Sequence, residues 1–97
     1  MRVRNTSSSN GNKAANQFLI DGEHNGQQGA FFQSYDTVIA FRPSNGSSAT
    51  LDASAWDYST TTSKYRNQFL NETTKETKAK IASGEYILAD LNKGVKR

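Results

Sequence analysis

The residue pattern of this chain changes after Asp52. Before that point, short apolar and aromatic runs are separated by turn dipeptides such as Asp21-Gly22 and Asn25-Gly26, as in antiparallel strands. After it, Tyr65 and Phe69 have the spacing that places two side chains on one helical face. Strands followed by helices indicate an α+β fold, with a mostly antiparallel sheet of about four strands and two short helices packed on one face.

The pattern also predicts the limits of these elements. The strands cover residues 16–20, 30–41, 49–52 and 86–91, and the second of them has room for a bend near residue 35. A first helix covers about residues 61–71, and a capping box of Thr73 and Glu76 starts a second helix that ends at Gly84. The predicted core residues are Phe18, Ile20, Phe32, Val38, Ala40, Leu51, Trp56, Tyr65, Phe69, Ile81, Ile87 and Leu91.

The domain organisation follows from chain length and apolar content. Ninety-seven residues are enough for one domain, which we place at residues 16–97. Residues 1–15 are rich in Ser and Asn and have almost nothing apolar to bury, so we expect a flexible, basic N-terminal arm. Only 34% of the residues are hydrophobic, and association of the chain with itself as a homo-oligomer could add the burial that a thin core lacks.

Two absences in the sequence limit the environment of the protein. The chain has no cysteine, so a disulfide framework and thiolate metal sites are excluded, and a reducing cytoplasm is favoured. The apolar runs are only four or five residues long, far short of the roughly 18 needed to cross a bilayer. We therefore expect a soluble protein with no membrane partner.

The chain also lacks a recognisable catalytic or metal-binding pattern. Asp21, Glu23 and His24 lie within four residues, but their spacing is not that of a metal loop, and we interpret His24 as a solvated turn residue. The hydroxyl run at residues 59–63 has no general base nearby in the sequence. We expect neither an enzyme nor a bound metal or cofactor.

Charge is distributed unevenly along the chain. The net charge is +3 over residues 1–14, −4 over residues 15–63 and +4 over residues 64–97. The basic last third makes binding to DNA or RNA an alternative function. A hydroxyl-rich helix start beside two cations can also hold an anion or nucleotide. The residues of this candidate anion site are Ser59, Thr60, Thr61, Lys64 and Arg66.

One sequence pattern carries a resemblance to known proteins. It reads S-Y-x-T-x-I-A from Ser34, then L-D at Leu51, then W-x-Y-S-x-T-T-x-K-Y-R-x-x-F-L from Trp56. This pattern resembles a family of small bacteriophage and prophage proteins of uncharacterised function. The resemblance covers nearly everything after residue 30 and leaves the first fifteen residues outside.

The resemblance implies an accessory role in infection. We expect a non-enzymatic inhibitor in the host cell cytoplasm that binds a host defence protein or ribonucleoprotein, foremost a CRISPR–Cas effector, by stoichiometric contact. A DNA- or RNA-binding accessory protein and a nucleotide or anion sponge remain the alternatives. Aromatic and arginine residues dominate binding hot spots, so we place the contact on the helices. The expected contact residues are Tyr65, Arg66, Lys75, Lys78 and Lys80.

Overall fold

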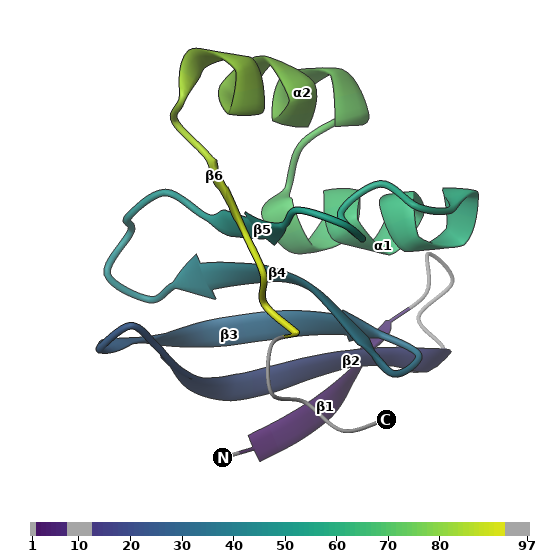
Figure 1. The fold of residues 1–97 in the computed structure, drawn as a ribbon. Coiled ribbons are helices and arrows are strands. Elements are labelled where there is room, and N and C mark those ends of the chain that lie inside the picture. The colour runs from purple at the N-terminus through teal and green to yellow at the C-terminus, as the bar shows by residue number, and fades with distance from the viewer. Residues whose placement is uncertain (1, 8–12, 93–97) are drawn as a thin grey trace.

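The computed structural model describes residues 2–7 and 13–92, and the α+β class predicted from the change of pattern is confirmed. Within these residues, six strands form one sheet in the order of the sequence, and two helices lie between the fifth strand and the sixth (Figure 1). None of the described helices is long and apolar enough to cross a membrane. The elements are β1 (Arg2–Ser7), β2 (Lys13–His24), β3 (Gln27–Ser34), β4 (Thr37–Pro43), β5 (Thr50–Asp52), α1 (Thr60–Leu70), α2 (Thr74–Ser83) and β6 (Ile87–Ala89).

The described sheet has more strands than the predicted four. Its first four pairings are antiparallel, and β5 and β6 pair in parallel. The parallel pair is possible because the chain between these two strands passes through both helices, which is the long crossover that parallel neighbours need. The prediction of a mostly antiparallel sheet is confirmed, while the number of strands is wrong because β1 and the turn between β3 and β4 were missed.

The N-terminal segment forms strands where we expected a flexible arm. Arg2–Ser7 is strand β1, which pairs with β2, and residues 13–15 begin β2. In this pairing Val3 lies opposite Ile20 and Arg4 lies opposite Leu19. A strand added at a sheet edge is held by backbone hydrogen bonds to its neighbour, so it needs little apolar content of its own. The predicted arm is therefore wrong at these residues, and residues 1 and 8–12 lie outside the described part.

Two tight turns shape the hairpins. Asn25 and Gly26 take φ values of 51° and 82° between β2 and β3, which confirms the turn predicted from this dipeptide. Tyr35 takes φ 58° in the next turn and divides the predicted strand over residues 30–41 into β3 and β4. The sequence does not indicate this turn, because a positive φ is unusual for a residue with a bulky side chain such as tyrosine. The Tyr35 amide is held by a hydrogen bond of 2.6 Å to the Asn16 carbonyl.

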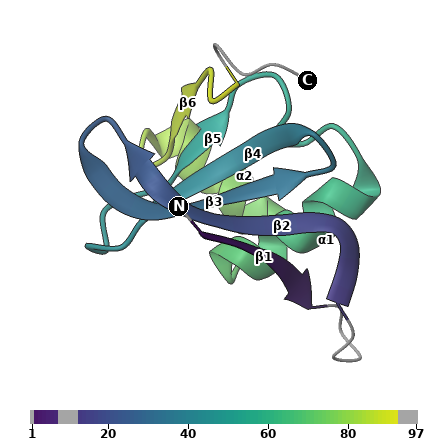
Figure 2. The same ribbon diagram turned by 90° about the horizontal axis from the view of Figure 1, so that it is seen from below.

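The helices begin and end as their capping residues predict. Ser59 accepts a hydrogen bond from the Thr62 amide at the start of α1. Thr73 and Glu76 form the predicted capping box of α2, and Gly84 ends that helix with φ 85°. Figure 2 shows both helices on the same side of the sheet. Only α1 packs closely on it, against β3 and β4, while the buried residue of α2 is Thr77.

The core lies mainly between the sheet and α1, and a smaller cluster of Val38, Phe41 and Leu91 lies on the other face of the sheet. Most of the predicted core is confirmed, but Ile87, which we assigned to the core, is 63% exposed, and Tyr86, which we did not, is 8% exposed. Tyr86 takes the inward position because its hydroxyl donates a hydrogen bond to Glu72. The inner cluster consists of Phe32, Ile39, Ala40, Ala49, Leu51, Ala55, Tyr65, Phe69, Leu70 and Tyr86.

Candidate interaction surface

Two of the five residues expected to contact a partner lie inside the protein. Tyr65 is 9% exposed and belongs to the core between α1 and the sheet. Arg66 is 0% exposed and faces the loop that precedes α1. Both side chains are therefore poorly placed for contact with a protein that docks on the surface.

The Arg66 guanidinium joins three segments of the chain. Nη1 donates to the Trp56 carbonyl at 2.6 Å and to Asp57 Oδ1 at 3.2 Å. Nη2 donates to Asn67 Oδ1 and to Thr74 Oγ1, both at 2.9 Å. The guanidinium carbon also lies 5.1 Å from the centre of the Trp56 ring. A buried cation needs such partners, and here they fasten the start of α2 and the loop before α1 to the body of α1.

Lys80, a third expected contact, is engaged by Glu72. Its Nζ lies 2.7 Å from Glu72 Oε1, and the Tyr86 hydroxyl donates to the same oxygen at 2.8 Å. Burial acts to raise the pKa of Glu72, but hydrogen bonds from Lys80, Thr77 and Tyr86 outweigh it and lower the pKa below its ordinary value. The hydrogen bond to Glu72 also raises the pKa of Lys80. This network ties α2 to the segment before α2 and to the residue before β6.

Lys75 and Lys78 differ from the other three expected contacts, because both are exposed on α2. Between them lies Glu76, whose carboxylate accepts the Thr73 amide at 2.9 Å in the capping box. The helix therefore presents two cations with an acid between them. This is a weak positive patch, smaller than the five-residue face expected from the sequence.

The expected anion site at the start of α1 carries an acidic group. Ser59 Oγ is engaged as the N-cap, and Asp57 borders the same hollow of about 370 Å³. A hydrogen bond from Ser63 lowers the pKa of Asp57. Partial burial acts to raise that pKa, but a further hydrogen bond from Arg66 keeps the net change downward. An ionised carboxylate at this place repels an anion, and the Nη1 and Nη2 donors of the buried Arg66 are engaged inside the protein.

Of the other three expected anion ligands, Thr60 lines this hollow, whereas Thr61 and Lys64 do not. Thr60, Thr61 and Lys64 are exposed on the first turns of α1. Lys64 Nζ lies 5.3 Å from the centre of the neighbouring Tyr65 ring, so its stem follows the helix surface. The geometry does not support the anion site.

His24 packs against the sheet, in contrast to the solvated turn position expected for it. Its ring centre lies 5.3 Å from that of Phe41 and 6.2 Å from that of Phe31. Asp21 and Glu23 lie before it on β2. In residues 2–7 and 13–92, no three His, Cys, Asp or Glu side chains gather so that they could hold a metal ion.

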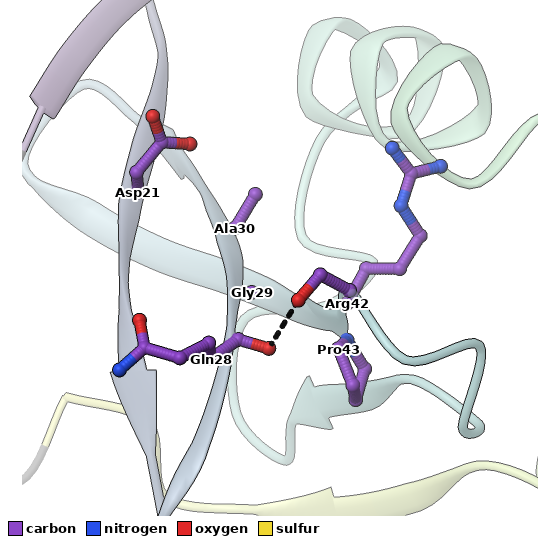
Figure 3. A pocket seen from close by; sticks show the side chains of 7 residues that line it. Asp21, Gln28, Gly29, Ala30, Arg42 and Pro43 are labelled. Atoms are coloured by element: carbon purple, nitrogen blue, oxygen red, sulfur yellow. Dashed lines mark hydrogen bonds between the residues drawn. The ribbon is translucent and has the colours of Figure 1, made fainter.

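A hollow of about 340 Å³ lies between β2 and β4 (Figure 3). Asp21, Ala30 and Arg42 line it, and they are in register on three neighbouring strands. Arg42 Nη1 donates to the Phe69 carbonyl at 2.6 Å, and its guanidinium carbon lies 4.9 Å from the Phe69 ring centre. The arginine thus places positive charge where the carbonyls of α1 end, which stabilises the helix.

Strand β6 presents apolar side chains at an open edge of the sheet. It is the last strand in the sheet order and pairs with β5. Ile87 is 63% exposed and Leu88 is 41% exposed. The exposed acids Glu85 and Asp90 lie on either side of this pair. Among residues 2–7 and 13–92 no strand pairs with the other side of β6, and adjacent large apolar residues on such an edge are typical of an interaction surface.

Our sequence reasoning missed this edge because it assigned Ile87 to the core. One signal could have revealed it: the apolar run from Tyr86 to Ala89 is bounded by two acids, and so short a strand has little chance of burying both of its faces. Two further aromatic residues are exposed, Tyr35 at 54% and Tyr58 at 51%.

The fold and its surface define a small α+β protein with exposed apolar residues at the end of its sheet. The chain belongs to a family of unknown function, DUF8033, whose model matches residues 1–85. This match includes the first fifteen residues, which the resemblance to phage proteins left outside. Comparisons with curated proteins and with solved structures found no match.

Proposed function

We propose that this protein is a phage or prophage accessory protein that inhibits a host defence system by stoichiometric, non-enzymatic binding. Its partner is a host defence protein or ribonucleoprotein in the host cytoplasm, foremost a CRISPR–Cas effector. The observation that carries the proposal is the exposed pair Ile87 and Leu88 on the open edge of the sheet.

The energetic argument for binding is the apolar surface that this pair leaves in water. Burying a large aliphatic side chain contributes about 1.5–3 kcal/mol, so covering the exposed parts of both side chains supplies roughly 2–3 kcal/mol. An apolar centre surrounded by polar residues is the usual arrangement of a protein–protein interface. The contact therefore moves from the helix face expected earlier to β6, with Lys75 and Lys78 on α2 as additional charged groups.

Phage challenge of cells that carry defined defence systems tests the proposal. Expression of the wild-type protein should restore phage growth against one of these systems, and the protein should co-purify with a component of that system. The double substitution Ile87→Ser and Leu88→Ser should abolish both effects. Tyr58→Ser, at another exposed residue, is the matched control and should change neither.

Two results would contradict this function. One is unchanged defence against phage in every system that is tested. The other is recovery of nucleic acid alone, with an affinity that falls steeply as salt is raised, because that behaviour belongs to a DNA- or RNA-binding protein.

A further inference from the structure

We propose that β6 receives its partner as an added strand, and that the partner segment is extended and basic. In this segment an apolar residue stands opposite Leu88, with Lys or Arg two positions before it and three positions after it. The inference rests on the proposed function, since it describes how the defence protein is bound. It is built from the backbone direction of β6 and from the charges beside it.

The backbone of β6 leaves one residue facing outward. The Ile87 amide donates to the Ala49 carbonyl at 3.5 Å, and the Ala89 carbonyl accepts from the Ala53 amide at 2.9 Å. The polar groups of Ile87 and Ala89 therefore face the β5 side. Because successive residues of a strand direct these groups to opposite sides, the Leu88 N–H and C=O face the open edge. An antiparallel partner residue opposite Leu88 can bond to both groups.

The side chains around Leu88 select the chemistry of that partner. Ile87 and Leu88 are exposed, and they point to opposite faces of the sheet, so an apolar residue on the added strand can cover part of either. Glu85 stands three residues before Leu88, and Asp90 stands two residues after it. Both acids lie just outside β6, and if the added antiparallel strand extends past both ends of β6, partner positions three after and two before the central residue come nearest to them. Opposite charges across a strand pair are stabilising, so the partner is basic at both positions.

The same charges disfavour a second copy of β6 as the occupant. If two copies paired antiparallel with Leu88 opposite Leu88, Asp90 of one copy would stand opposite Tyr86 of the other. Glu85 of the second copy, which precedes that Tyr86, would then lie close to Asp90 of the first copy. The same contact would occur at the other end of the pair with the two copies exchanged. Like charges in neighbouring positions destabilise a strand pair, so this edge fits a basic segment better than it fits itself.

A charge-swap experiment with two peptides tests the inference. Each nine-residue peptide has a central Val within a Val and Thr background and a Lys two positions before it. Three positions after the Val, the first peptide has Lys and the second has Glu. Binding is measured by NMR titration of the ¹⁵N-labelled full-length protein. The wild-type protein should bind the first peptide about two- to five-fold more tightly, with shift changes centred on Leu88.

Matched variants separate the pairing from general charge attraction. Glu85→Lys should reverse the preference between the two peptides. Glu23→Lys has the same change of charge on β2 and should leave the preference unchanged. Leu88→Pro should weaken both peptides, because it removes the outward N–H, and proline is tolerated on a strand edge that faces solvent. The wild-type Leu88 amide should exchange rapidly with solvent and become protected when peptide is added.

Three results would overturn the inference. These are equal binding of both peptides, shift changes centred on α2, and a Leu88 amide that exchanges slowly in the free protein. Sedimentation would show whether slow exchange comes from a second copy. If the serine double variant loses inhibition of defence while Leu88→Pro keeps it, the proposed function stands and strand addition fails. If the peptides bind as expected while no defence system is inhibited, the proposed function fails alone.

Discussion

Replacing Arg66 with methionine should lower the free energy of unfolding by about 3 kcal/mol. Methionine fills much of the space of the arginine stem, so the loss arises from polar contacts more than from a cavity. The Trp56 carbonyl loses its 2.6 Å donor, and an unsatisfied buried carbonyl costs about 1–3 kcal/mol. Asp57 keeps its bond from Ser63, and Thr74 keeps its bond from Asn67, which limits the remaining cost.

Urea denaturation followed by fluorescence and far-ultraviolet circular dichroism measures this change. Trp56 is the single tryptophan, and its ring lies over the Arg66 guanidinium, so its emission reports directly on this part of the fold. Lys64→Met removes an exposed cation from the same helix and should change the free energy by no more than about 0.5 kcal/mol. Arg66→Lys keeps the charge but loses the forked donor geometry, so its effect should fall between the two.

The outcome decides between two interpretations of this arginine. If Arg66→Met stays within about 1 kcal/mol of the wild type, the internal network does not hold the helices as argued. If the variant also keeps its stability but no longer captures its partner, Arg66 is a contact residue and the burial argument is refuted. A large loss of stability together with a normal effect of Lys64→Met supports the structural role.

Three more measurements test particular features of the fold. Because the pKa of Glu72 is lower in the folded chain, its contribution to stability is complete above the ordinary value of 4.5 and is lost as pH falls below it. Urea midpoints between pH 3 and 6 should therefore decline less steeply in Glu72→Gln. Gly29→Ala should lower the free energy of unfolding by about 2 kcal/mol in urea titrations, because a Cβ there would lie 2.3 Å from the Arg42 carbonyl oxygen. Gly46→Ala is the control: its Cβ would meet no atom, so it should cost only the strain of φ 86°, about 1 kcal/mol. Tyr35→Asn should raise the thermal midpoint, since asparagine accepts φ 58° with less strain by about 0.5–1 kcal/mol, and an unchanged or lower midpoint would contradict that reasoning.

The features that we predicted correctly from sequence are governed by short-range backbone rules. Thr73 and Gly84 act at the ends of α2, where the side chain or its absence satisfies backbone groups within four residues. Asn25 and Gly26 adopt the positive φ values that their residue types permit. In each case the cause lies within one turn of the chain, so the sequence contains the whole of it.

The features that we missed depend on distant parts of the chain. β1 forms because it can pair with the backbone edge of β2. The composition of Arg2–Ser7 does not indicate that a strand lies beside it. Arginine is rarely fully buried, so Arg66 was expected on the surface until the loop carbonyl and the acid that receive it were known. Tyr86 and Ile87 exchanged their expected positions because Glu72, fourteen residues before Tyr86, accepts the tyrosine hydroxyl.

The internal pairing of charges also changes how the basic last third of the chain is interpreted. Residues 64–97 contain eight cations, but Arg66 is paired with Asp57 and Lys80 with Glu72 inside the fold. The positive field that this segment offers to a polyanion is therefore weaker than its sequence charge indicates, which lowers the expected affinity for nucleic acid. The contribution of the exposed apolar pair on β6 to binding is not reduced by such charge pairing, because it comes from removing apolar surface from water. This combination of a reduced positive field and a local apolar surface supports our proposal that the partner is a protein and that it contacts the end of the sheet rather than the helices.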